Sequence, residues 1–317
     1  MRDYVAHGPH VERIWWILSL GASIGIVTSA LFLPGGDDLY RYYIPFENGC
    51  LDCGYVPYYA QWFLWPLHML PDYPYAWPVW TIINVLGFMS LAYFTGINPF
   101  LFIISFPVLG QLWLGQVDLL ICVGIVIFLF AKNPYIRGLG ICLALTKPQL
   151  MALAILLSLL LENPKSLAKL IAVPILVLLM SLFIYGPKWP IGWVSNALHD
   201  LPVHSWRLAS IDIWRFGIFL IPVPLLLRDQ RKRMEAALLV SALATPFFGV
   251  YSYVTFLLLN TKWWTWALSY GWIIGYYWFG ASAMRFAWIL PLFMLLMLMY
   301  EVWVERGKNE SKTGKES

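Results

Sequence analysis

Charged side chains are scarce in this sequence: Asp, Glu, Lys and Arg make up 12% of the 317 residues, while hydrophobic residues make up 60%. Soluble domains carry about 25% charged residues, so this composition excludes an ordinary soluble protein. The net charge of +4 comes from scattered basic residues with one compact run at 228–233. That run indicates a cytoplasmic anchor rather than a nucleic-acid surface. The composition therefore predicts an all-α protein that crosses the membrane several times.

Other absences narrow the possibilities further. The chain has no internal repeat, no Gly-rich loop that would cradle a nucleotide, and no soluble domain. Only four cysteines occur, and the Cys50-x-x-Cys53 pair lacks a second pair at metal-site spacing, which argues against zinc. Cys50 and Cys53 either form a local disulfide or remain unpaired. No Ala-x-Ala-like site follows the first apolar stretch, so we expect this stretch to be retained as a helix. We expect no metal and no cofactor.

Apolar segments of helical character run along the whole chain. We predict helices at about 14–33, 76–94, 99–113, 117–131, 136–146, 149–161, 168–185, 210–227, 235–245, 248–260, 263–281 and 284–304. Several fall short of the ~20 residues that span a bilayer and are expected to be half-spanning. Polar or helix-breaking residues interrupt the apolar sequence at 114–118, 146–149 and 245–249. Irregular backbone at membrane depth persists only where it is buried in protein or lines a wet cavity, so these breaks indicate a site.

The basic residues predict an orientation. With a cytoplasmic N-terminus, most Lys and Arg residues fall on the inner side, as the positive-inside rule requires. Both termini are then cytoplasmic, and two larger loops at about 34–75 and 186–209 lie on the outer face with all three polar breaks. We expect one membrane domain over residues 1–305, in the cell membrane, and a disordered polar tail at 306–317.

Two adjacent carboxylates, Asp37 and Asp38, follow the first apolar segment in Pro34-Gly35-Gly36-Asp37-Asp38. Carboxylates close to hydrocarbon are costly, and two neighbours repel each other, which raises the proton affinity of the pair. Such a group suits a general base that acts on a hydroxyl. The same residues are also typical of a solvated turn, so both interpretations stay open.

Lys147 is the strongest candidate for a residue that binds an anion. It lies in an apolar stretch, directly before Pro148 and next to the polar Gln149. Buried membrane cations are usually functional, although a lysine can also snorkel to the interface. In the preceding break, Gln116 and Asp118 are two residues apart; Asp118 either contacts a ligand or caps the next helix.

The second outer loop and the helix after it supply further candidates. His199, His204 and Arg207 lie in or near the loop and could contact a phosphate or carry a proton, although single histidines are more often plain surface residues. Arg215 lies three residues after Asp212, and we expect these two side chains to pair with each other.

The motifs together resemble glycosyltransferase family 87, the polyprenyl-phosphate-sugar-dependent enzymes of GT-C fold that include bacterial mannosyltransferases. The similar segments are Gly115-Gln116-Val117-Asp118, the Gly-rich run 138–149 that ends in Lys147-Pro148-Gln149, Tyr185-Gly186-Pro187, Ala244-Thr245-Pro246, and Asp38-Leu39-Tyr40-Arg41-Tyr42-Tyr43. Two features depart from the family pattern. Asp118 replaces the usual Asn, and 247–251 replaces a polar, His-bearing segment.

The resemblance implies a GT-C-like bundle of about 10–12 spanning or half-spanning helices and a sugar transfer at the outer face. The donor would be a polyprenyl-phosphate sugar, with mannose suggested, and the acceptor a lipid or glycan hydroxyl. Asp38 would be the general base, assisted by Asp37, in an inverting attack. Lys147, with Arg207 or Arg215, would bind the donor phosphate. Other substrate contacts would come from Gln116, Asp118, Gln149, Tyr42, His199 and His204.

Two alternatives remain at this point. A transporter or flippase for a lipid-linked solute would also use broken helices and a cation in the membrane. Transporters tend to show inverted repeats and polar groups reachable from both faces, and neither is apparent here. A catalytically inactive relative that acts as a scaffold would keep the fold and could lose Asp38 or Lys147 without consequence.

Overall fold

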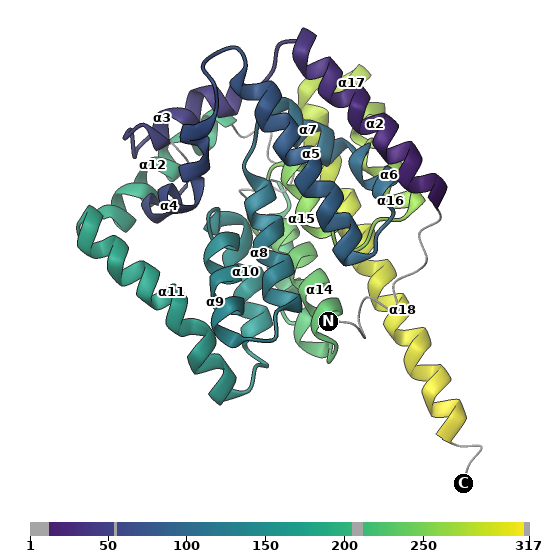
Figure 1. Ribbon diagram of the computed structural model, residues 1–317. Coiled ribbons are helices and arrows are strands. Elements are labelled where there is room, and N and C mark those ends of the chain that lie inside the picture. The colour runs from purple at the N-terminus through teal and green to yellow at the C-terminus, as the bar shows by residue number, and fades with distance from the viewer. Residues whose placement is uncertain (1–12, 54–55, 205–211, 247, 314–317) are drawn as a thin grey trace.

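The computed structural model describes residues 13–53, 56–204, 212–246 and 248–313, and within these ranges every regular element is a helix (Figure 1). Four stretches are long and apolar enough to cross a membrane: α2 (Arg13–Phe32), α5 (Ala76–Thr95), α11 (Pro164–Tyr185) and the run Trp263–Arg306. Shorter apolar helical segments lie at Asp118–Phe130, Pro148–Leu159 and Trp214–Leu226. The predicted all-helical, multi-pass membrane fold is confirmed.

Local sequence explains where the well-predicted helices begin. The helices α9 (Pro134–Ala144), α10 (Pro148–Leu159) and α11 each start at a proline, whose fixed φ suits the first helical turn. Asn133 and Asn163 cap α9 and α11 by accepting a hydrogen bond from a backbone N–H of the first turn. Together with α2, α5 and α8 (Asp118–Phe130), these helices lie close to the predicted segments.

Several segments predicted as single helices are broken, and those predictions are wrong. The segment 99–113 forms α6 (Pro99–Ile103) and α7 (Phe106–Leu114), because Pro107 starts a new helix after Ser105. Prolines 222 and 224 interrupt 210–227 in the same way. The segment 210–227 forms α13 (Trp214–Gly217), η5 (Ile218–Leu220) and η6 (Val223–Leu226). The segment 248–260 forms η7 (Val250–Tyr253) and α15 (Val254–Leu257), and the segment 263–281 forms α16 (Trp263–Ser269) and α17 (Trp272–Phe279). The last predicted segment, 284–304, falls within η8 (Gly280–Trp288) and α18 (Ile289–Thr313).

Three other segments are more helical than predicted. The predicted outer loop 186–209 contains α12 (Trp189–His204). Helix α14 (Gln230–Ala244) begins before the predicted 235 because the side chain of Asp229 accepts a hydrogen bond from the backbone N–H of Lys232. Helix α18 continues through Thr313, into the stretch where we expected a disordered tail.

The first predicted outer loop is a folded cap over one end of the bundle. It contains η1 (Leu39–Tyr43), α3 (Ile44–Glu47), η2 (Tyr58–Ala60), α4 (Gln61–Leu64) and η3 (Trp65–Met69). Its apolar core, with Leu39, Phe46 and Leu64, packs on Trp77 of α5 and Val117. The Cys50–Cys53 pair is a disulfide. Figure 1 shows α3, α4 and α12 gathered at the same end of the molecule.

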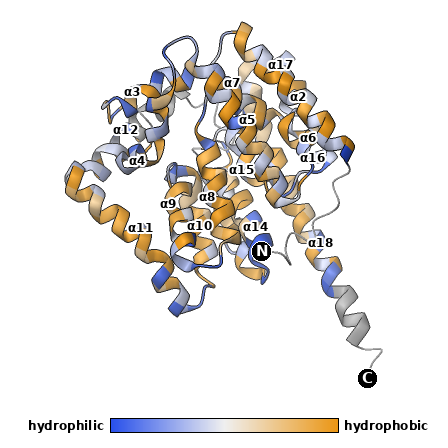
Figure 2. Cartoon of the chain, in the orientation of Figure 1, coloured by the Kyte–Doolittle hydropathy of each residue, from blue (hydrophilic) through white to orange (hydrophobic). Residues whose placement is uncertain are grey.

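Helix α11 has a surface suited to lipid. It is hydrophobic along most of its length (Figure 2), and only 11% of its apolar window is buried in the protein. Phe183, for example, is 90% exposed. Exposed apolar surface of this extent is stable against hydrocarbon and not against water, which agrees with an integral membrane protein.

Helices α8 and α9 touch through two glycines. A Cβ on Gly124 would lie 2.5 Å from the backbone oxygen of Gly140 and 2.5 Å from the backbone nitrogen of Ala144. A Cβ on Gly140 would lie 2.7 Å from the backbone nitrogen of Phe128. Small residues let membrane helices approach closely, and added atoms in such a contact force the backbones apart.

We therefore expect Gly124→Ala to destabilise the protein by about 1–3 kcal/mol through overpacking. The measurement is the temperature at which half of the detergent-solubilised protein loses its monodisperse peak. Gly21→Ala on α2 is the matched control, because nothing lies within 4 Å of a Cβ built there. Equal midpoints for both variants would contradict the close α8–α9 contact.

Candidate functional site

Two of the polar breaks and the predicted first loop meet in one buried group of side chains, which we call the Gln116 cluster. Its members come from segments far apart in the sequence, and each is at most 5% exposed. They are Asp38, Tyr43, Gln116, Asp118, Lys147 and Ser252. The breaks at 114–118 and 146–149 therefore do lie together, as the sequence predicted, and the first loop reaches them.

The side-chain amide of Gln116 lies at the centre of this cluster and contacts both a carboxylate and an ammonium group. Its Nε2 donates to Oδ2 of Asp38, and its Oε1 accepts from Nζ of Lys147 at 2.5 Å and from the hydroxyl of Tyr43 at 2.6 Å. Its backbone carbonyl accepts from Nε1 of Trp80 at 3.0 Å. Hydrogen bonds between buried polar groups restrict their arrangement, so Gln116 holds Asp38 and Lys147 relative to each other.

Lys147 forms a buried salt bridge with Asp118. The other carboxylate oxygen of Asp118 accepts from the hydroxyl of Ser252 at 2.7 Å. Lys147 is 4% exposed and does not snorkel to the interface. Asp118 does not cap α8, since the N-cap position is Val117 and carries no side-chain cap bond. The capping role considered for Asp118 is therefore not seen, and its contact with a ligand stays a prediction.

The proline after Lys147 sets the backbone at this position. Proline 148 starts α10, and a residue before proline is sterically kept out of the α region. Lys147 accordingly has φ −128° and ψ 80° and separates α9 from α10. Its ammonium lies 5.6 Å from the ring of Tyr43 and 5.5 Å from the ring of Tyr251, where cation–π attraction adds to the ion pair.

Gly115 lets the first loop reach Gln116. It ends α7 with φ +70°, a conformation that favours glycine. A Cβ there would lie 2.7 Å from Cβ of Leu39 and 3.1 Å from Cα of Gly36. The backbone N–H of Gly36 donates to the carbonyl of Trp113 at 2.8 Å. These contacts place Asp38, two residues after Gly36, beside the amide of Gln116.

The two adjacent aspartates have different surroundings. Asp38 is 4% exposed and contacts Gln116. The side chain of Asp37 is 43% exposed, and its Oδ1 lies 2.8 Å from Nε of Arg41. The expected repulsion between the two carboxylates is therefore weak, because Arg41 and solvent offset the charge of Asp37. Assistance of Asp38 by Asp37 stays a prediction, and the pairing with Arg41 indicates that its effect is small.

Tyr43, which follows the predicted Tyr42, belongs to the cluster. Tyr42 is partly exposed on η1, whereas Tyr43 is buried. Burial raises the pKa of the Tyr43 hydroxyl well above its ordinary value, and the nearby carboxylates Asp118 and Asp38 raise it further. Tyr43 thus stays protonated and acts as a donor. Tyr42 and Tyr43 are adjacent and chemically identical, so the sequence contains no signal that only one of them would be buried.

The remaining predicted residues are not members of the cluster as defined above, or lie outside the described part of the chain. Gln149 is half-buried in the first turn of α10. Asp212 contacts Arg285 at 3.5 Å, and the guanidinium of Arg215 lies over the ring of Trp214 at 5.7 Å, so the expected Asp212–Arg215 pair is wrong. Arg207 lies outside the described residues, as do the side chains of His199 and His204 on α12.

Ser252 was missed by the sequence analysis. It follows the Thr245-Pro246 break, where the sequence is otherwise aromatic, and a serine among aromatic residues gives no distinct signal. The described ranges contain no group of three His, Cys, Asp or Glu side chains that could hold a metal ion.

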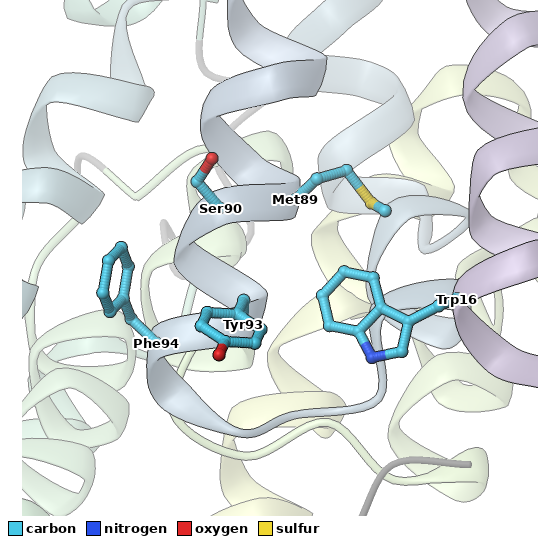
Figure 3. Close-up of a pocket in the computed structure, with 5 residues that line it drawn as sticks. All are labelled: Trp16, Met89, Ser90, Tyr93 and Phe94. Atoms are coloured by element: carbon cyan, nitrogen blue, oxygen red, sulfur yellow. The ribbon is translucent and has the colours of Figure 1, made fainter. Parts of the chain in front are cut away.

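Two apolar cavities open on the outside of the bundle. One, of about 420 Å³, lies between α2, α5 and α7 and is lined by residues that include Ala30, Trp77, Thr81 and Trp113. A wider one of about 590 Å³ lies between α2 and α5, where Trp16 faces Met89 and Tyr93 (Figure 3). Trp77 in the wall of the first cavity lies against Gly36, which is two residues from Asp38.

Comparison with known families gives one match. Residues 55–221, which hold Gln116, Asp118 and Lys147, match Glycosyltransferase family 87. Asp38 and Ser252 lie outside the matched residues. No curated protein and no solved structure matches the chain. The family match covers more than half of the 317 residues, and the chain therefore belongs to glycosyltransferase family 87.

Proposed function

We propose that this membrane glycosyltransferase moves a sugar, with mannose the first to test, from a polyprenyl-phosphate donor to an acceptor hydroxyl at the outer face of the membrane. The observation that supports this most is the amide of Gln116, which holds the carboxylate of Asp38 and the ammonium of Lys147 in one buried site. A base for the acceptor and a cation for the leaving phosphate are the two charges that this transfer needs.

Asp38 is the proposed general base. Its carboxylate takes the proton of the acceptor hydroxyl while that oxygen attacks the anomeric carbon of the donor. The bond from the anomeric carbon to the phosphate oxygen breaks on the opposite side, so configuration inverts and polyprenyl phosphate leaves with the electron pair. Tyr43 remains a proton donor, which leaves Asp38 as the better-suited base beside Gln116.

Lys147 is the proposed cation for the leaving phosphate. An ammonium has three donors, and the described contacts to Gln116 and Asp118 use two of them. Donation of the third to a phosphate oxygen would stabilise the charge that develops as the bond breaks. Arg215 and Arg207 remain weaker proposals for the same role, and contacts of the substrate with Gln149, Tyr42, His199 and His204 likewise stay proposals.

We place the first isoprene units of the prenyl chain, next to the phosphate, in the cavity between α2, α5 and α7. The cavity is apolar, has a volume of about 420 Å³, and includes the rings of Trp77 and Trp113 in its wall. Gly36 packs on Trp77 and bonds to the backbone of Trp113, so the headgroup of a lipid in this cavity would lie near Asp38.

Washed membranes that contain the protein test the donor. We expect transfer of radiolabel from polyprenyl-phosphate mannose, and no transfer from a nucleotide sugar when formation of the lipid-linked sugar is blocked. Both observations follow from a donor that is bound through a lipid chain and a single phosphate. Transfer directly from the nucleotide sugar, or from none of a panel of polyprenyl-phosphate sugars, would contradict the proposed donor.

A further inference from the structure

Five aromatic side chains from three segments stack on one another at the end of the molecule that carries the first loop. We call them the aromatic patch: Tyr58, Tyr59, Trp62, Tyr185 and Trp189. Tyr58 is stacked on Trp189 with ring centroids 5.5 Å apart, and Trp62 is stacked on Tyr185 at 6.1 Å. The segments concerned are the first loop, the end of α11 and the start of α12.

This patch differs from an ordinary aromatic belt. Trp and Tyr residues at a membrane interface are usually spread around the protein, each with its own polar edge in the headgroup region. Here the rings contact each other, and Trp189 is only 6% exposed. Its indole N–H is buried without a hydrogen-bond acceptor among the described residues. A buried donor without a partner is costly, and a ligand oxygen would satisfy it.

Neutral polar and acidic groups surround the patch. The hydroxyl of Tyr58 donates to Asp52, and Nδ2 of Asn196 donates to the same carboxylate at 3.0 Å. The hydroxyl of Tyr185 donates to Oε1 of Gln61 at 3.0 Å. None of these groups is a cation, although the exposed Lys188 precedes Trp189 in the sequence. An acid, amides and stacked rings suit a neutral, hydroxyl-rich ligand better than a phosphate.

Tyr59 connects the patch to the Gln116 cluster. Its ring packs edge-on against Trp189 at 6.0 Å, and its hydroxyl donates to the carbonyl of Leu145 at 2.5 Å. Leu145 lies two residues before Lys147. A ligand on the patch would therefore lie close to the site that holds Asp38. The patch is built from other segments than α2 and α7, the helices that line the cavity proposed for the prenyl chain.

From this arrangement we infer that the aromatic patch binds a sugar ring of the acceptor. The apolar C–H face of a hexose packs on an aromatic ring, and its hydroxyls find acceptors and donors in the Asp52, Asn196 and Gln61 side chains. The acceptor is thus a glycoside, carried either by a lipid or by a soluble glycan. The inference rests on the proposed transfer to a hydroxyl, and it names the class of molecule that bears that hydroxyl.

Saturation-transfer NMR on the purified, detergent-solubilised protein tests the inference without any donor. The probes are methyl hexosides (mannoside, glucoside and galactoside) for the soluble source and octyl hexosides, with octanol as the chain-only control, for the lipid source. We expect saturation of the ring protons of at least one hexoside, and the two probe sets show which source binds. The signal should be lost in Trp62→Leu and kept in Trp62→Phe and in Trp65→Leu, which removes an exposed ring of the same loop.

Kinetics with labelled polyprenyl-phosphate sugar and the hexoside that binds add a second readout. Trp62→Leu should raise the acceptor KM about tenfold, equivalent to ~1.4 kcal/mol, with the donor KM unchanged. Ring-proton saturation that persists in Trp62→Leu, or a change in donor KM alone, would overturn the inference. Failure of the lipid donor is distinguishable, because it abolishes transfer and leaves hexoside binding intact.

Discussion

Asp38→Asn should lower kcat by about 10²–10⁴-fold, the range typical for loss of a general base. Asparagine has nearly the same shape as aspartate, and its Oδ1 can still accept a hydrogen bond from Nε2 of Gln116. The variant therefore removes the proton acceptor while the cluster keeps its geometry. The measurement is the initial rate of sugar transfer from saturating polyprenyl-phosphate donor, normalised to inserted protein.

Asp37→Asn is the matched control, because it makes the same chemical change one residue away. Asp37 is exposed and paired with Arg41, so we expect its loss to change kcat less than threefold, in line with the small contribution of exposed ion pairs. Full activity in Asp38→Asn, or an equal loss in both variants, would show that Asp38 is not the base.

The positions of the polar breaks could be predicted from sequence because they depend on local chemistry. Proline 148 separates α9 from α10, and Gly115 ends α7, whatever the rest of the chain does. Low charge and long apolar runs likewise predicted the membrane fold. The apolar surroundings of the adjacent aspartates and of Lys147 selected these residues, and the family resemblance favoured Asp38 over Asp37 and added Gln116.

The pairings inside the site depend on packing between distant segments, and the sequence carries no local signal for them. Asp118 could equally have been a helix cap, and only the approach of Lys147 and Ser252 shows otherwise. Asp37 and Asp38 look alike in sequence, but the contact of Gly36 with Trp113 and Trp77 turns one carboxylate inward. Asp212 contacts Arg285 instead of Arg215 for the same reason, since residues 73 positions apart in the sequence meet only in the fold.

The second large effect is expected at Lys147, where loss of activity and loss of stability have to be measured separately. Lys147→Met leaves the carboxylate of Asp118 buried without its cation, which should cost about 3–5 kcal/mol of stability. We expect this variant to insert poorly or to unfold at a much lower temperature in detergent. Its inactivity alone would therefore say little about the phosphate.

The double variant Lys147→Met with Asp118→Asn removes both charges together. A buried pair replaced by neutral groups of similar volume is often close to neutral in stability, so we expect the thermal midpoint to return near that of the wild type. Transfer should nevertheless remain at least about a hundredfold below the wild type, as is typical when one electrostatic stabiliser of a developing charge is lost. A double variant that is both stable and active would show that Lys147 serves only to neutralise Asp118. A stable and inactive one would support the binding of the leaving phosphate by the ammonium itself, because the fold and the Gln116 amide persist while the cation is gone.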